Sequence, residues 1–296
     1  MRFSIFLGCF IPVRLPHIEK VARSVLGEIG VELQDIGGFT CCPEPVGFHI
    51  NDKLTATAIA ARNIALAEEQ GNDIITLCNG CTYVLKQVND ELKRDSELRD
   101  KVNEVLAETD HEYRGTIDVK HFAQVLNEDI GLDRLAKKVE RPLSGLSVAG
   151  HTGCHILSPP DVMKFDDPYD PVVLDNMVAA LGAEPADFSM KTICCGWTLT
   201  NYGERQSANQ LVGAKLQAME VAGSDCISVI CPQCFYQFDT GQMMATRSLK
   251  LDLKLPVLFY LQLLALSMGY SLDDIHYGQH RVKSPGFEDK LGRILA

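Results

Sequence analysis

Two stretches of nine residues, Asp73–Cys81 (DIITLCNGC) and Cys226–Cys234 (CISVICPQC), share one pattern. In each, a short apolar run ends in a cysteine, and a second cysteine follows after two further residues. An apolar run of this length that is rich in β-branched residues predicts a buried β-strand. Because the same strand and Cys-x-x-Cys pair occur once in each half, the chain is expected to be a duplication of one structural unit.

Ten of the eleven cysteines belong to a longer form of this repeat, which reads Cys9-x31-Cys41-Cys42-x35-Cys78-x2-Cys81 and then Cys154-x39-Cys194-Cys195-x35-Cys231-x2-Cys234. Scattered structural thiols would not recur with the same gaps. We interpret them as two similar ligand sets on two similar frames. The eleventh thiol, Cys226, aligns with Asp73, and we interpret it as a buried small hydrophobic residue.

The length of 296 residues is enough for two domains that each bury a core. We expect them at residues 1–144 and 145–296, with the boundary near Arg141-Pro142. The formal net charge of -11 argues against a nucleic-acid partner, which requires a basic surface.

The N-terminal apolar run is too short for a signal peptide, so we expect a cytoplasmic protein. There, thiols are kept reduced, which favours metal ligation over disulfides. The most apolar stretch, Leu255–Met268, is shorter than the ~20 residues that a membrane span requires. We interpret it as a buried helix or a docking surface, without a membrane span.

Both halves predict the same order of elements. In the first half, strands are expected at residues 3–8, 31–36 and 73–77, and helices at 16–28 and 54–69. Residues 92–141 are expected to form a charged helical connection that includes one more strand near 117–122. In the second half, strands are expected at 146–149 and 226–230 and helices at 172–181 and 207–222. The fold class is therefore α/β, with two tandem pseudo-symmetric βαβ-type domains, parallel sheets and cysteine clusters at the C-terminal ends of strands. Ligands of open α/β sheets bind at that edge, where helix N-termini also favour anionic groups.

Four thiolates suit either zinc or an iron-sulfur cluster. Each half offers five, including an adjacent pair, and tetrahedral zinc would leave one thiol unused. The count therefore favours a multi-iron cluster other than a simple cubane, while zinc stays open.

The pattern, with Cys194-Cys195-Gly196 in the second copy, resembles the cysteine-rich CCG domain of heterodisulfide reductases. Two copies along the whole chain resemble the catalytic B subunit of the enzymes from methanogenic archaea. The first copy departs from the pattern, because Pro43 stands where the second has glycine; glycine supplies backbone freedom and no ligand atom, so ligation is expected to be unaffected.

The resemblance implies two non-cubane [4Fe-4S] clusters, one at each five-cysteine set. It also implies reduction of the coenzyme M–coenzyme B disulfide to two thiols. Cleavage of a disulfide takes two electrons, whereas an iron-sulfur cluster usually passes one, so two clusters around one bond suit this reaction. In that family a small C subunit with conventional clusters and a flavoprotein A subunit deliver electrons, fed by a hydrogenase or formate dehydrogenase.

The copies differ beside their first cysteine. Phe6 and Phe10 flank Gly8-Cys9, whereas His151 and His155 occupy the equivalent positions beside Cys154. Histidine titrates near neutrality, so we predict His155 as the proton donor to the product thiolates, with His151 as second candidate and backbone hydrogen bonding as the structural alternative. Both coenzymes are anionic, and the cationic candidates near the cysteine loops are Arg14, Lys53 and Arg205.

Two other functions stay open from the sequence. The chain could be a CCG subunit of another reductase or dehydrogenase, acting on fumarate, glycerol-3-phosphate or lactate. It could also be a zinc-stabilised scaffold or an electron relay without catalysis. Metal content separates the zinc alternative from the others.

Overall fold

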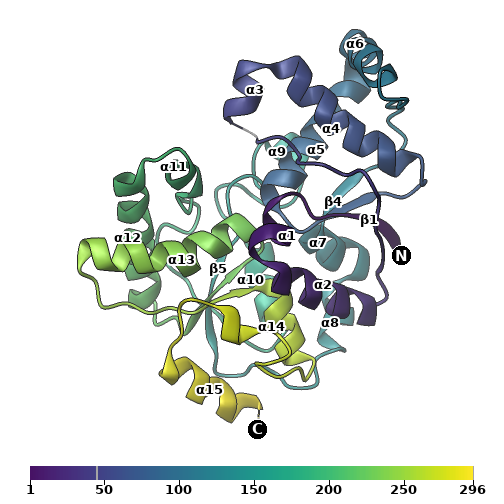
Figure 1. Ribbon diagram of the computed structural model, residues 1–296. Helices are drawn as coiled ribbons and strands as arrows, with labels where there is room; N and C mark the ends of the chain where they lie inside the picture. Colours follow the sequence, from purple (N-terminus) through teal and green to yellow (C-terminus); the bar gives the residue numbers. More distant parts are fainter. Residues whose placement is uncertain (45, 296) are drawn as a thin grey trace.

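Each half of the chain forms a four-stranded parallel sheet. Figure 1 shows the strands covered by helices, with β1 and β4 in the first half and β5 in the second. The computed structural model describes residues 1–44 and 46–295. The strand order is β2-β1-β3-β4 in the first sheet and β6-β5-β7-β8 in the second, so the two sheets have equivalent topologies. The predicted α/β fold with two pseudo-symmetric parallel sheets is confirmed.

The first half contains four strands and their connecting helices. In chain order they are β1 (Arg2–Phe6), α1 (Phe10–Arg14), α2 (Pro16–Glu28), β2 (Glu32–Gln34), α3 (Gly47–Asn51), α4 (Lys53–Glu68), β3 (Ile74–Thr76), α5 (Asn79–Arg94), α6 (Ser96–Ala107), β4 (Val119–His121), α7 (Phe122–Gln124), the π-helix η1 (Val125–Ile130) and α8 (Leu132–Ala136). The helix α2 begins with Pro16, which favours a first helical turn. The alanine-rich α4 is capped by Asp52, whose carboxylate accepts a hydrogen bond from Thr55 N at 3.0 Å.

The second half repeats this arrangement, with two residues in the edge strand β6 against three in β2. Its elements are β5 (Ser147–His151), α9 (Pro160–Met163), α10 (Val173–Ala179), β6 (Glu184–Pro185), α11 (Trp197–Asn201), α12 (Arg205–Val221), β7 (Cys226–Val229), α13 (Pro232–Leu249), β8 (Val257–Phe259), α14 (Tyr260–Ser267), the 3-10 helix η2 (Tyr277–Gln279) and α15 (Pro285–Leu295). The central strands β5 and β7 are almost wholly buried, as the apolar runs predicted. Cys226 is buried at the start of β7, at the opposite end of that strand from Cys231.

The stretch Leu255–Met268 is not one helix. Its first part forms the strand β8, and the chain turns into α14 where the Gln262 side chain accepts a hydrogen bond from Phe259 N at 2.9 Å. All of its residues are buried, and α14 packs against α2 of the first half. The interpretation of this stretch as a docking surface is therefore wrong, because burial leaves it nothing to present to a partner.

The two sheets lie on either side of the predicted domain boundary, with β4 ending at His121 and β5 starting at Ser147. The connection before the boundary is helical and charged, as predicted, but it also buries Val102 and Leu106 of α6. Its end is tied to the second half, because Ser267 O accepts hydrogen bonds from the backbone N of residues 140 and 141. The division at residues 144 and 145 itself stays a prediction.

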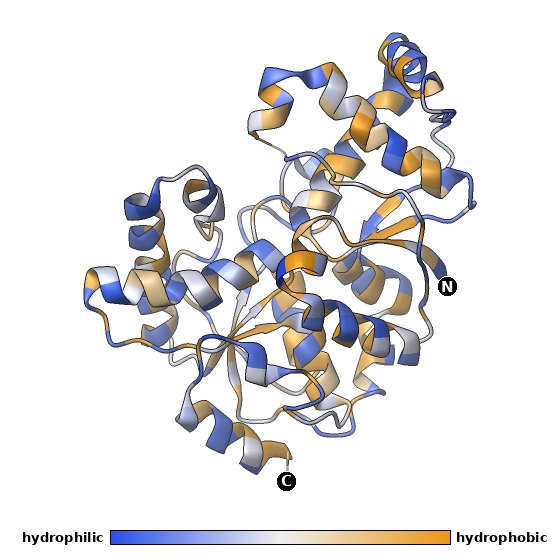
Figure 2. Cartoon of the chain, viewed as in Figure 1, coloured by the Kyte–Doolittle hydropathy of each residue, from blue (hydrophilic) through white to orange (hydrophobic). Residues whose placement is uncertain are grey.

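The apolar residues gather on the strands and on the inner faces of the helices, while the outer helix faces are polar (Figure 2). This is the amphipathic pattern of helices that cover a buried sheet. Within residues 1–44 and 46–295, no helix combines the length and the apolar character needed to cross a lipid bilayer.

Candidate metal centres

Parallel strands bring the cysteines to one edge of each sheet. Cys9 and Cys78 follow β1 and β3, which are hydrogen-bonded neighbours with Phe6 beside Thr76. In the second sheet, Cys154 and Cys231 follow β5 and β7 in the same way. The second cysteine of each Cys-x-x-Cys pair lies in the first turn of the following helix, α5 or α13.

A glycine before the first cysteine of each set is required by the geometry. Gly8 and Gly153 have φ values of +64° and +85°, in the left-handed region that favours glycine. A Cβ on Gly8 would lie 2.7 Å from Cys81 Sγ, and one on Gly153 would lie 2.5 Å from Asn79 Nδ2. The missing side chain therefore lets the first loop approach the Cys81 thiol and the second loop approach the Asn79 side chain of the other half.

The adjacent cysteine pairs lie on loops that are anchored differently in the two halves. In the first half, Asn63 of α4 accepts a hydrogen bond from Thr40 N at 2.9 Å and donates one to Cys41 O at 3.2 Å. In the second half, the buried Lys215 ammonium of α12 donates to Met190 O at 2.6 Å and Ile193 O at 2.7 Å. Burial lowers the pKa of Lys215 to about 8, which the neighbouring thiols oppose.

The ten thiols form one continuous row. Cys9 Sγ lies 3.8 Å from Cys41 Sγ, and Cys154 Sγ lies 4.0 Å from Cys194 Sγ. Between these ends, each thiol lies close enough to the next to shift its pKa, in the order Cys41, Cys42, Cys81, Cys78, Cys231, Cys234, Cys195, Cys194. The contact between Cys78 and Cys231 joins the two sets and pairs two equivalent positions of the repeat.

The donor set fits a thiolate-ligated metal centre. Two sulfurs bound to one tetrahedral metal at ~2.3 Å lie ~3.8 Å apart, close to both measured separations. The hydrogen bond to Cys41, together with burial, raises the pKa of the Cys9 thiol, whereas hydrogen bonds from Cys154 and Cys195 lower that of Cys194. A cation bound among them would stabilise the thiolate form of both. Five sulfur donors in each half suit an iron-sulfur centre better than a single zinc ion.

The halves interlock through the residues that follow their first cysteines. Phe10 packs edge-on against Tyr236 of α13 with ring centroids 5.5 Å apart. His155, the equivalent of Phe10, stacks on Tyr83 of α5, the equivalent of Tyr236, at 5.1 Å. Each half therefore completes the surroundings of the other half's Cys-x-x-Cys helix.

A cavity of about 440 Å³ opens over the first set, and residues of the second half form its far wall. Trp197 and Gln233 line this cavity and also a small one over the second set. Trp197 is held edge-on against Phe10 at 5.1 Å. The cavities over the two sets therefore adjoin each other at Trp197 and Gln233 and together make up the cleft of the site, which the sequence did not show.

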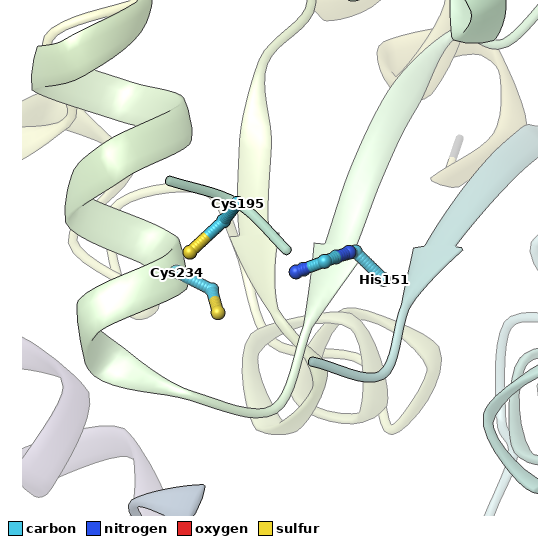
Figure 3. A group of neighbouring side chains, drawn as sticks. All are labelled: His151, Cys195 and Cys234. Atoms are coloured by element: carbon cyan, nitrogen blue, oxygen red, sulfur yellow. The ribbon is translucent and has the colours of Figure 1, made fainter. Parts of the chain in front are cut away.

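The two predicted proton donors lie in different surroundings. His155 is half-buried and lines the cavity of the second set. His151 is buried at the end of β5, and one of its ring nitrogens and the sulfurs of Cys195 and Cys234 lie within 4.8 Å of one another (Figure 3). Burial lowers the pKa of His151 to about 3, so it is neutral near pH 7. Both assignments stay predictions, and exposure to the cleft favours His155.

The predicted cationic residues are spread over the surface. Arg14 lines the cavity of the first set and a neighbouring one of about 730 Å³ that also contains Arg281 and Lys283. Lys53 forms an ion pair with Glu91, and Arg205 is exposed at the start of α12. Neither of the two lines a cysteine cavity. Their role in binding substrate stays a prediction, and the geometry supports Arg14.

The sequence reasoning missed four residues that shape the site: Asn79, Trp197, Lys215 and Gln233. Three of them have a signal in the sequence, because Asn79 and Gln233 lie inside the Cys-x-x-Cys pairs and Trp197, the one tryptophan, follows Cys195-Gly196. Lys215 has none, since one lysine in a helix is normally solvated.

The comparisons with known proteins agree with this site. Residues 3–86 and 148–239 match the family described as CCG, the cysteine-rich domain. The chain is 38% identical over its whole length to the B subunit of a ferredoxin/F420H2-dependent CoB-CoM heterodisulfide reductase from Methanosarcina acetivorans, covering 98% of it. It is 30% identical to an 8-methylmenaquinol:fumarate reductase membrane anchor subunit from Wolinella succinogenes, over 90% of this chain and 92% of that one.

Two matches to one cysteine-rich domain define the class, a tandem CCG-domain protein. Within that class, the chain belongs to the family that includes the B subunits of heterodisulfide reductases. A solved structure of a hypothetical protein from Helicobacter pylori shares the fold, with a TM-score of 0.79 and 18% identity over 96% of this chain. This chain spans about half of that protein, 52% of its length.

Substitution of Gly8 with alanine tests the close approach at the first set. The new Cβ would meet Cys81 Sγ at 2.7 Å in a backbone conformation that alanine rarely adopts. We expect Gly8→Ala to lose the first metal centre and keep the second, which would halve the metal content per chain. Elemental analysis of the purified protein measures this.

Gly27→Ala is the matched control, because a Cβ there meets nothing within 4 Å and lies in the helix α2. It should keep the full metal content and gain up to ~1 kcal/mol of stability from helix propensity. Full metal content in Gly8→Ala would show that the loop does not need the glycine.

Proposed function

We propose that the chain is the catalytic subunit of a heterodisulfide reductase and reduces the coenzyme M–coenzyme B disulfide to the two thiols. We further propose that each five-cysteine set holds a non-cubane [4Fe-4S] cluster. The relatives named as B subunits of heterodisulfide reductases support the class of reaction. The observation that carries the proposal is the closeness of the two thiol sets, which approach each other at Cys78 and Cys231 beneath two adjoining cavities.

The reaction needs two electrons and two protons: the S–S bond breaks, each sulfur gains one electron, and each thiolate takes a proton. Clusters at both sets would supply the electrons one at a time. The chain itself supplies the position of the disulfide. Trp197 and Gln233 line both cavities, so a substrate that contacts them lies between the two sets.

Arg14 is the cation best placed for the anionic ends of the substrate. It lies between the cysteine cavity and the neighbouring cavity with Arg281 and Lys283. Among the described residues, no carboxylate forms an ion pair with Arg14 or Arg281. Guanidinium groups without a partner suit sulfonate, phosphate and carboxylate groups.

His155 is the proposed proton donor, because it lines the cleft directly after Cys154. Stacking on Tyr83 fixes the ring plane, and Nδ1 of the ring lies beside Gly80 of the first set, 3.7 Å from a Cβ built there.

The remaining parts of the proposal concern the surroundings of the protein. The relatives are subunits of larger enzymes, which supports partner subunits in general. We propose a ferredoxin-like C subunit and a flavoprotein A subunit, with a hydrogenase or formate dehydrogenase as the source of electrons, in the cytoplasm. The 30% identity to a fumarate reductase subunit favours, as the second candidate, a CCG subunit of another reductase.

The decisive experiment measures metal content and disulfide cleavage together. Cluster-containing protein should hold about eight irons and eight acid-labile sulfides per chain and cleave the heterodisulfide with an artificial one-electron donor. Cys81→Ala should lose about four irons and full turnover. Cys226→Ala is the matched control, since Cys226 lies outside both sets, and should keep both. Two zinc ions per chain, or wild-type turnover in Cys81→Ala, would contradict the proposal.

Loss of the Arg14 charge is expected to weaken substrate binding. Arg14→Gln should raise KM about tenfold or more, as expected for the loss of one charge-assisted hydrogen bond, with a smaller effect on kcat. Arg205→Gln tests the competing prediction in the same assay. A raised KM in Arg205→Gln with no change in Arg14→Gln would reverse the assignment.

His155→Gln tests the proton donor. The amide keeps a hydrogen-bonding side chain in the cleft but cannot give up a proton near neutrality. We expect turnover to fall about 100-fold or more and the pH dependence of kcat to change. Unchanged turnover with an unchanged pH profile would leave His155 only the structural role.

A further inference from the structure

The His151 side chain has no hydrogen-bond partner although it is 1% exposed. Both ring nitrogens are buried, and no described residue is bonded to either. An imidazole carries at least one N–H donor in any protonation state. A buried donor without an acceptor costs about 1–3 kcal/mol, so a histidine in this place indicates an acceptor that the protein chain alone does not complete.

The direction of the ring identifies that acceptor. His151 lies at the end of β5 and points towards Cys195 and Cys234, both members of the second set (Figure 3). Phe238 of α13 packs edge-on against the ring at 5.0 Å, which limits its rotation. The ring therefore faces the sulfurs of the second centre.

The first set has no such donor. The position equivalent to His151 is Phe6, whose ring is fully buried and packs edge-on against Phe39 at 5.1 Å. A phenyl ring offers no N–H. The two copies thus present different groups to equivalent places.

Two other contacts of the thiol sets also differ between the halves, and both add a donor or a positive group near the second set. Gly196 N donates to Cys194 Sγ at 3.3 Å, whereas Pro43, its equivalent, has no N–H. Lys215 is fully buried near Cys195 and Cys234, whereas its equivalent, Arg62, is half-exposed and donates to Gly38 O. The second set is therefore surrounded by more buried positive and donor groups.

We propose that the His151 N–H donates a hydrogen bond to a sulfur of the second centre and raises the reduction potential of that centre. The physical reason is that a donor stabilises the more negative, reduced state of an iron-sulfur centre. His151 is a positioning residue in this role and transfers no proton. The inference rests on the proposed function, because it requires an iron-sulfur centre at the second set.

The test uses the purified, cluster-containing protein with the variant His151→Phe, which copies the first half. A redox titration followed by electron paramagnetic resonance should resolve two one-electron transitions in the wild type. In the variant, one of them should become about tenfold harder to reduce, a downward shift of ~59 mV. The other transition and the iron content should not change.

Two further variants separate tuning from structure. His151→Gln keeps an amide N–H, so the reduction potential of the second centre should return part of the way to its wild-type value. His280→Phe removes another buried histidine, one that contacts Gln262 and is not among the groups around the thiols, and should move neither transition. Transitions that stay in place in His151→Phe, or that shift by the same amount at both centres, would overturn the proposal.

Two more outcomes decide the case. Loss of iron in both His151 variants would identify His151 as a ligand and overturn the proposal. If His151→Phe does not fold, nitrogen hyperfine coupling in the wild type labelled with ¹⁵N at histidine alone decides, because a hydrogen-bonded imidazole gives a weak coupling that follows the label, whereas the coupling of a backbone amide such as Gly196 N does not. Zinc without redox transitions in the wild type would instead refute the proposed function, a result distinct from unmoved transitions.

Discussion

The contact between Cys78 and Cys231 fixes the arrangement on which the site depends. These residues are equivalent in the repeat, and equivalent residues of two related units touch only at their symmetry axis. Once this pair lies on the axis, the other contacts follow in matched pairs, as Phe10 against Tyr236 and His155 against Tyr83 show. The duplication therefore places the two thiol sets side by side beneath adjoining cavities, rather than at distant sites.

A shared frame also lets the halves diverge without disturbing each other's fold. Gly8 and Gly153 are kept because the backbone conformation and the close approach allow no side chain. The positions around them are free to differ, as the phenyl ring of Phe6 and the imidazole of His151 do. The geometry of the cysteines is thus common to both halves, whereas the polarity around them is not. A substrate with two different ends would meet an asymmetric environment.

The sequence predicted the parts of this structure that depend on local pattern. Apolar runs that end in cysteine became β3 and β7, and the fold class and the sheet edge followed from them. It could not predict the interlock, because the packing of Tyr83 against His155 depends on the relative position of two sheets that share no local signal. The stretch Leu255–Met268 was misjudged for a related reason, because a continuous apolar run does not distinguish a buried strand from a buried helix. The hydrogen bond from Phe259 N to the Gln262 side chain, which marks the start of the helix, could not be read from that run.

The row of thiols also explains why this site is coupled to metal binding. Adjacent thiols cannot all ionise, because hydrogen bonds to the neighbouring sulfurs, together with burial and repulsion between thiolates, raise the pKa of members such as Cys154 and Cys234. A bound cluster requires thiolates, so loading displaces these protons and is favoured as the pH rises. The loops that carry Cys41 and Cys194 are held by Asn63 and Lys215 without the metal, which keeps the donors together while they are still protonated. Preorganisation by the protein thus offsets part of the electrostatic cost that ten neighbouring sulfurs impose.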